Sequence, residues 1–255
     1  MELPSWVPDY SVCIDYCPLV VPESGSRRQY SASGSSASQI CSAKDSPSHL
    51  WVQGYKIDHI LDLASVESAA PELNDKVEEW ERLIDLLSDQ YVAGGTKREA
   101  LWRTLVGDQT HHPWSQYPAP AYYEDYYSAC MAMFKYQRRD PKTMEELAGM
   151  LREDGVTAEE FEEMLEKQSL FLDAMRTVMI SRRLFVTETG YVGAAPVSAR
   201  VGDIVCIFEG GAVPYVIRAD KVEGWRFMGE CYVQGIMDGE VLARVGFVWE
   251  KMRLT

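Results

Sequence analysis

The chain has 255 residues, of which 46% are hydrophobic and 25% are charged, as is typical of a globular protein with a substantial core. Its formal net charge of −14 opposes binding to nucleic acid or to an anionic membrane, because neutralising phosphates requires clustered Lys and Arg. No apolar run approaches the roughly 18 residues of a membrane span, and the first residues form no signal peptide. We therefore expect a cytoplasmic protein with reduced cysteines and a single compact domain over residues 1–255.

The first 66 residues are predicted to be extended or β-structured. Leu3–Tyr16 contains prolines and aromatic residues, which favours an extended segment laid across the body. Ser24–Ser48 has the Ser- and Gly-rich composition of a loop, although Arg28–Ser33 is compatible with an edge strand. The apolar run Leu50–Leu63 predicts one or two strands.

Residues 71–181 are predicted to form a helical layer. Apolar side chains recur at three- and four-residue spacing from Pro71 to Tyr91, which indicates one face of a helix. A second helix, dense in aromatic residues, is predicted over Ala121–Tyr136. Three Thr-x-x-Glu pairs predict further helix starts, because the threonine oxygen accepts a first-turn N–H and the glutamate reaches back. These helices begin at Thr96, Thr143 and Thr157.

Residues 183–255 are predicted to form a sheet. Short apolar runs alternate there with Gly and Asp turn signals, and they are Ile204–Phe208, Val213–Ile217, Trp225–Met228, Cys231–Val233 and Phe247–Leu254. Glu209–Gly211 predicts a hairpin connection, because Gly adopts positive φ without strain. Strands, then helices, then strands favour the α+β class. We expect an antiparallel β-sheet or small barrel, mainly C-terminal, packed against a helical bundle from the middle of the chain.

Several segments are similar to one family of fungal proteins. The most specific is Gly229–Glu240 (GECYVQGIMDGE), and the others are Phe185–Gly193 with Pro196, Gly202–Cys206, Gly210 with Pro214–Arg218, Leu3–Tyr10 and Arg98–Asp108. They resemble the C-terminal region of the heterokaryon-incompatibility (HET domain) proteins. The sequence departs from that pattern at Gln234, where many relatives have His.

The resemblance implies a module without its usual N-terminal partner. In larger family members this region follows an N-terminal HET domain, which is held to carry the cell-death effector function. Here residue 1 falls almost on the Leu-Pro-Ser-Trp motif that comes after that domain. The resemblance also favours structural roles for two carboxylates over roles in acid–base chemistry. Asp238 would cap its own turn, and Glu240 would pair with an arginine such as Arg183 or Arg218.

The sequence contains none of the common cofactor signatures. It has no Gly-rich dinucleotide or phosphate loop, no HExxH and no GxSxG motif. Its six cysteines lack metal-ligand spacing, and the adjacent His111 and His112 point apart on any regular element. His59, in an apolar strand-like run, is expected to be an ordinary core or surface histidine. We therefore expect neither a cofactor nor a metal ion.

Two functions remain open. The first is a cofactor-independent enzyme of fungal specialised metabolism, such as a cyclase, isomerase or pericyclase of the intramolecular [4+2] type. With 14 Tyr and 7 Trp, the chain could build an aromatic-lined pocket that holds a hydrophobic small molecule in a reactive conformer. The predicted catalytic donors are Tyr191, Tyr215, Arg218 and Tyr232, and the predicted substrate-binding residues are Tyr122, Tyr126, Trp225 and Glu240.

The second function is a non-catalytic recognition module in heterokaryon incompatibility or innate immunity, which binds a protein or a ligand. It follows from the resemblance alone. The oligomeric state is left open by the sequence.

Overall fold

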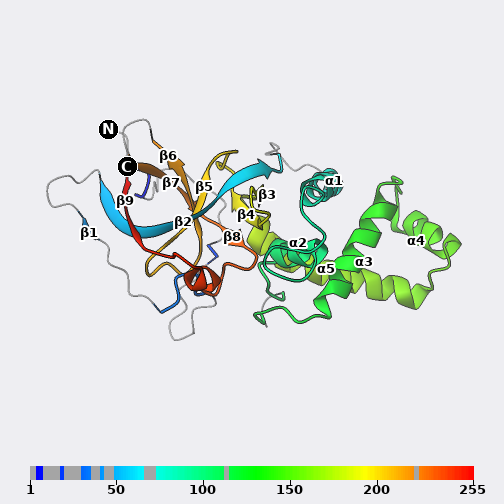
Figure 1. The fold of residues 1–255 in the computed structure, drawn as a ribbon. Helices are drawn as coiled ribbons and strands as arrows, with labels where there is room; N and C mark the ends of the chain where they lie inside the picture. The colour runs from blue at the N-terminus through cyan, green and yellow to red at the C-terminus, as the bar shows by residue number, and fades with distance from the viewer. Residues whose placement is uncertain are drawn as a thin grey trace.

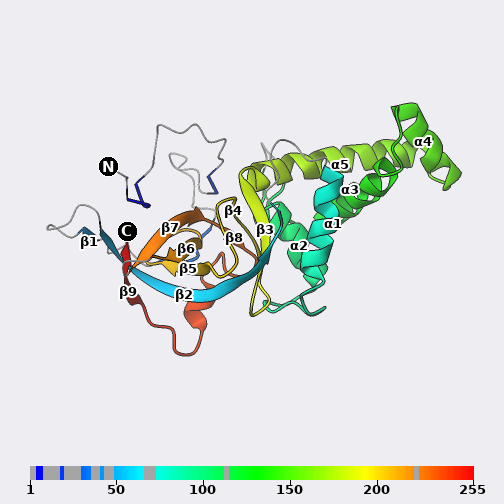
Figure 2. The ribbon, with the colours of Figure 1, turned by 90° about the horizontal axis from the view of Figure 1, so that it is seen from above.

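The computed structural model describes residues 4–7, 18–19, 30–35, 41–42, 49–65, 73–111, 115–220 and 224–255, with the backbone alone at 41–42 and 73–76. In these residues the strands gather on one side of the molecule and the helices on the other (Figure 1). Seen from above, the longest helix runs away from the strands (Figure 2). The molecule is therefore α+β, as the sequence predicts, with its β part and its helical part meeting along one junction.

The described strands form one nine-stranded sheet. They are β1 (Cys41–Ser42), β2 (Leu50–Leu63), β3 (Arg182–Thr187), β4 (Val192–Pro196), β5 (Ile204–Phe208), β6 (Tyr215–Ala219), β7 (Trp225–Glu230), β8 (Tyr232–Val233) and β9 (Glu250–Leu254). Strands β2, β9, β7, β6 and β5 close into a barrel, because β5 pairs with β6 on one side and with β2 on the other. These pairings are antiparallel apart from β7–β9, which is parallel. The predicted hairpin at Glu209–Gly211 joins β5 to β6.

Strand β2 connects the barrel to the rest of the sheet. It is one continuous strand of 14 residues, which pairs first with β9, then with β5 and finally with β3. Beyond it the order continues through β3, β4 and β8 toward the helices. Its register shifts between Lys56 and Asp58 and again between Ile60 and Asp62. Such bulges bend a strand, and the bend allows β2 to pair with the barrel strands β9 and β5 at one end and with β3 at the other.

The helical part contains α1 (Leu73–Ile84), α2 (Lys97–Leu105), α3 (Tyr123–Gln137), α4 (Met144–Glu153) and α5 (Ala158–Met179). The three predicted N-cap threonines each accept a hydrogen bond from the backbone N–H three residues later, and they are Thr96, Thr143 and Thr157. At Thr157 the capping box is complete, because Glu160 accepts from the Thr157 N–H. Glu99 instead accepts from Arg103, at 2.9 Å, and so contributes to the site described below.

The first predicted helix is shorter than its apolar pattern suggests. It ends at Ile84 rather than at Tyr91. Tyr91 is still buried, but from the turn that follows the helix. From there its hydroxyl donates to the Gln234 carbonyl at 2.9 Å and accepts from the Val192 N–H at 3.1 Å. Contacts with the sheet therefore outweigh the helical pattern in this segment.

Two other predicted elements differ from the observed ones. The last strand begins at Glu250 rather than at Phe247. Tyr30–Ser33, the described part of the possible edge strand, forms no strand, and the N–H of Gly34 donates to the Ser31 carbonyl in a turn. The predicted loop Ser24–Ser48 otherwise lies largely outside the described residues.

The N-terminal residues 4–7 lie against the C-terminal end of the chain. The Ser5 N–H donates to the Thr255 carbonyl at 3.1 Å, and the Phe227 N–H donates to the Ser5 hydroxyl at 2.9 Å. Trp6 packs beside the barrel strands. The remainder of the predicted extended segment Leu3–Tyr16 lies outside the described residues.

One hydrophobic cluster runs through both parts of the molecule. It includes Phe185 and Val205 from the strands, and Trp102 and Phe171 from the helices, each at most 1% exposed. The junction between the β part and the helices is therefore a packed interior.

Two findings bear on the chemistry of the interior and on membranes. The cysteines whose side chains are described, Cys130, Cys206 and Cys231, are buried free thiols. Burial raises the pKa of each, that of Cys130 to about 12, so these thiols stay protonated. None of the helices in the described residues is long and apolar enough to span a bilayer.

Candidate functional site

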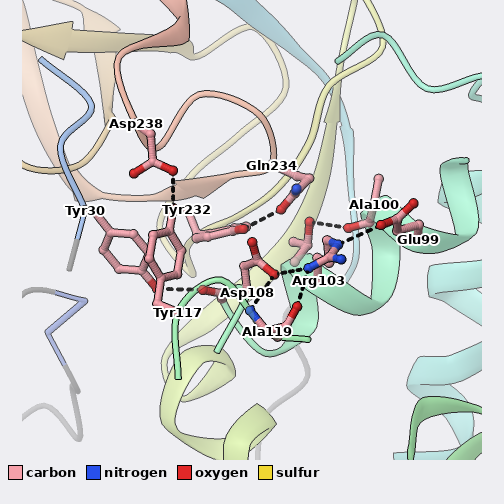
Figure 3. A network of polar contacts seen from close by, with 12 residues as sticks. Tyr30, Glu99, Ala100, Arg103, Asp108, Tyr117, Ala119, Tyr232, Gln234 and Asp238 are labelled. Carbon is pink, nitrogen blue, oxygen red and sulfur yellow. Dashed lines mark hydrogen bonds and ion pairs between the residues drawn. The ribbon is translucent and has the colours of Figure 1, made fainter. Parts of the chain in front are cut away.

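Two segments far apart in the sequence meet at the junction. The loop after α2 brings Asp108, and the segment after β8 brings Gln234 and Asp238 (Figure 3). They lie in Arg98–Asp108 and Gly229–Glu240, two of the segments that carry the resemblance to HET proteins. The polar and aromatic side chains that meet at this junction are called the junction network. Its members are Tyr30, Arg103, Asp108, Gln109, Tyr117, Tyr232, Gln234 and Asp238.

Asp108 is a buried carboxyl group held by Arg103. Arg103 Nη1 donates to Asp108 Oδ1 and, at 2.9 Å, to the Ala119 carbonyl. Its Nε donates to Glu99, also at 2.9 Å. Asp108 is 7% exposed and has a φ of 54°, in the left-handed region that Asp tolerates better than most residues. Burial raises the pKa of Asp108, and the nearby charge of Arg103 counteracts part of that effect.

Three tyrosines pack close to this carboxyl group. The Tyr30 ring meets those of Tyr117 and Tyr232 edge to face, with ring centroids 5.1 and 6.0 Å apart. Tyr30 donates to the Gly107 carbonyl at 2.7 Å, and Tyr232 donates to the side chain of Gln234. Burial raises the pKa of all three phenols, so each remains a protonated donor.

A polar pocket of about 350 Å³ lies beside the network. Its walls include Tyr91, Glu99, Arg103, Gln234 and the Gly94–Gly95 turn. The Arg103 guanidinium is already paired with two carboxylates, Glu99 and Asp108. The pocket therefore offers hydrogen-bonding groups but little unpaired charge.

A second pocket, of about 310 Å³, lies on the barrel. We call it the aromatic pocket, and its walls include Trp6, Val52, Phe208, Tyr215, Phe227 and Leu254. Phe208 stacks on Tyr215 with ring centroids 5.0 Å apart, and the Tyr215 and Phe227 centroids are 5.6 Å apart. The walls come from the N-terminal segment and from β2, β5, β6, β7 and β9. This pocket therefore exists only when the barrel is closed.

The profile of the Het-6 beta-barrel domain matches residues 47–246. That range covers most of the chain and contains every described helix and the strands β2 to β8. The chain belongs to the Het-6 β-barrel family. One curated relative is heterokaryon incompatibility protein 6, OR allele, of Neurospora crassa, which is 25% identical over 94% of this chain. The chain spans 38% of that relative's length. No solved structure matches the chain significantly.

The Het-6 barrel places the three tyrosines predicted to be catalytic in different surroundings. Tyr215 lines the aromatic pocket. Tyr232 is 1% exposed and belongs to the junction network. Tyr191 is buried, and its hydroxyl accepts a hydrogen bond from Arg244. The structure therefore does not bring these phenols together around one cavity.

The two charged residues predicted for the site bind other parts of the chain. Arg218 holds Asp203 with two hydrogen bonds, at 2.7 and 2.8 Å, and Asp203 is only 3% exposed. Glu240 accepts from the Asp238 N–H at 2.8 Å, so Glu240 caps the turn that Asp238 was predicted to cap. Among the ion pairs of the described residues there is none between Glu240 and an arginine. The predicted Glu240–arginine pair is therefore wrong.

The aromatic residues predicted to bind substrate lie in two places. Tyr122 and Tyr126 pack against each other at the start of α3, with ring centroids 5.8 Å apart, and border neither the polar nor the aromatic pocket. Trp225 packs against the same barrel cluster as Tyr215 and Phe227. One predicted catalytic residue and one predicted binding residue thus lie together at the barrel.

Several residues of the Het-6 barrel sites were missed by the sequence analysis. Asp108 ends a segment that carries the family resemblance, which is a signal that could have singled it out. Phe208 is the last residue of a predicted strand, next to the predicted hairpin Glu209–Gly211. Tyr117 carries no such signal, because it meets Asp238 only in the folded chain.

Proposed function

We propose that this Het-6 barrel is a recognition module of heterokaryon incompatibility, which binds a small hydrophobic molecule in the aromatic pocket. The name of the Neurospora crassa relative supports the biological setting. The proposal that the ligand is a small hydrophobic molecule rests on the aromatic walls of this pocket. These walls are contributed by segments that meet only when the barrel closes.

The pocket suits a small molecule better than a protein surface. Its volume of about 310 Å³ lies at the lower end of the range for ligand pockets, which is roughly 300–1,000 Å³. Aromatic rings supply a large apolar contact area at low cost in side-chain entropy. Polar groups border it at Gln53, Glu209 and the Gly210–Gly211 backbone, and they would orient a ligand that carries a hydrogen-bonding group.

A cofactor-independent cyclase acting in the same pocket is the second candidate. It is supported by Tyr215, the one predicted donor that lines this pocket, because a phenol beside an apolar cavity can polarise a substrate carbonyl. A [4+2] closure would convert a polyene into a cyclic isomer of equal mass. The separation of Tyr191, Arg218 and Tyr232 from this pocket makes recognition the better-supported function.

The test is a thermal-shift and mass-spectrometric screen of fungal culture extracts. We expect a hydrophobic metabolite to stabilise the wild type and to co-purify with it, and this stabilisation to be lost in Phe227→Leu. Phe247→Leu is the matched control, because Phe247 packs against Tyr55 and Trp249 outside the aromatic pocket. A bound metabolite recovered as an isomer of equal mass would establish the cyclase. A protein partner captured without any small molecule would contradict the pocket's role.

A further inference from the structure

Three side chains with metal-ligating groups converge outside both pockets. They are Asp58 and His59 of β2 and Glu188, which follows β3. A carboxylate oxygen from each acid and a nitrogen of the imidazole all lie within 4.8 Å of one another. The sequence gives no hint of this group, because Glu188 is 129 positions away from His59 and no metal-binding motif connects them.

Asp58 and His59 are consecutive residues of β2, and consecutive residues of a regular strand point to opposite faces. Asp58 is buried and His59 is exposed, yet a carboxylate oxygen of Asp58 and an imidazole nitrogen of His59 lie within 4.8 Å of each other. The register shift between β2 and β5 lies just before this pair, between Lys56 and Asp58. Glu188 is brought alongside by the backbone, because its N–H donates to the His59 carbonyl at 3.0 Å.

Asp58 is positioned as a fixed carboxylate. It is 8% exposed and accepts from the His59 N–H at 2.8 Å and from the Thr189 N–H at 2.9 Å. The Thr189 hydroxyl also donates to it, and a hydroxyl can rotate when a competing ligand arrives. Hydrogen bonds of this kind orient ligating carboxylates in metal sites.

His59 and Glu188, by contrast, are exposed. An ion could therefore enter from solvent without opening the core. One imidazole and two carboxylates form a mixed nitrogen and oxygen donor set, which suits divalent transition metals better than an all-oxygen set does. Three protein ligands would leave at least one coordination position for water.

We infer that Asp58, His59 and Glu188 form a binding site for a divalent transition-metal ion. The ion joins β2 to the turn between β3 and β4, at the point where the barrel strand passes into the rest of the sheet. It is a structural clamp, and it acts independently of a ligand in the aromatic pocket.

The test is calorimetric titration of the full chain with Zn²⁺, together with the visible absorption of added Co²⁺. We expect one Zn²⁺ per chain, a rise in the melting temperature, and Co²⁺ bands typical of nitrogen and oxygen ligation. His59→Ala and Glu188→Gln should each weaken binding on the order of tenfold or more, because even a residue that only orients a metal ligand contributes about 10- to 100-fold to the affinity. Both side chains are exposed, so neither change should unfold the protein.

The controls remove the same chemical groups elsewhere. His49→Ala removes another histidine, and Glu153→Gln neutralises an exposed carboxylate at the end of α4. Both should bind Zn²⁺ like the wild type. The inference is overturned if the wild type binds no Zn²⁺, or if stoichiometric binding survives both His59→Ala and Glu188→Gln.

Discussion

The hydroxyl of Tyr117 donates a hydrogen bond of 2.5 Å to Oδ2 of Asp238, across 121 positions of the chain. This contact joins the loop after α2 to the segment after β8, and so it links the helical part to the β part. The same segment contains Gln234, which receives hydrogen bonds from Tyr91 and Tyr232. The junction of the two parts is therefore held by phenol hydroxyls as well as by apolar packing.

Removing the Tyr117 hydroxyl should loosen this junction. We expect Tyr117→Phe to lower the free energy of unfolding by about 1 kcal/mol, because a hydrogen bond to an exposed carboxylate is lost while the ring remains. Urea denaturation would measure the change. Tyr122→Phe, at an exposed tyrosine of 55% accessibility, is the control and should have no measurable effect. Equal losses in the two variants would contradict the proposed role of the contact.

We expect Arg218 to stabilise the folded protein through its hydrogen bonds to Asp203. Arg218→Ala leaves the buried Asp203 carboxylate without two of its hydrogen bonds. We expect a loss of about 3 kcal/mol, because removing one partner of a buried ion pair strands the other charge. Arg152→Ala, at an exposed arginine of α4, should change stability by less than about 0.5 kcal/mol. A fully stable Arg218→Ala protein would show that the pair is dispensable for folding.

Asp108 should make stability depend on pH. Burial raises its folded-state pKa above the ordinary value of 3.8, despite the opposing effect of Arg103. Its contribution to stability is therefore fully present below pH 3.8 and is lost as the pH rises through the folded pKa. We expect the unfolding free energy of the wild type, relative to Asp108→Asn, to fall as the pH rises above that value.

Asn is the suitable replacement because it also tolerates the positive φ of this position. Urea denaturation of both proteins over a series of pH values would measure the difference. A difference that increases with pH in this window would mean that Asp108 has a lowered pKa, and that the ion pair with Arg103 outweighs burial.

The same substitution at two glycines should have opposite effects. A Cβ at Gly193 would lie 2.3 Å from the Tyr232 carbonyl and 2.6 Å from the Phe185 ring. Gly193→Ala should therefore separate β4 from β8 and lower the unfolding free energy by about 3 kcal/mol or more. Gly149 lies inside α4 with open space around it, so Gly149→Ala should stabilise the protein by about 0.5–1 kcal/mol. Thermal and urea denaturation of both variants would check the signs.

Local patterns determined much of the fold. Alternating apolar runs bounded by Gly located β5 and β7, and the Thr-x-x-Glu pairs located the starts of α2, α4 and α5. These signals act over a few residues, through backbone geometry and capping bonds, and so they can be recognised in the linear sequence. They were insufficient where a distant partner intervened, as at Tyr91, which leaves the helical pattern to bind the Gln234 carbonyl and the Val192 N–H.

The sites were decided by tertiary structure. Of the residues predicted to be catalytic, Tyr215 lines the aromatic pocket, whereas Tyr191, Arg218 and Tyr232 are paired elsewhere. Which phenol faces a cavity depends on barrel closure through the β2–β5 pairing, which brings together residues about 150 positions apart. The junction network and the Asp58–His59–Glu188 group depend on equally distant contacts. Sequence by itself therefore determined the α+β class, the caps and the family, whereas only the closed barrel decided which side chains share a site, because that depends on long-range pairing and register.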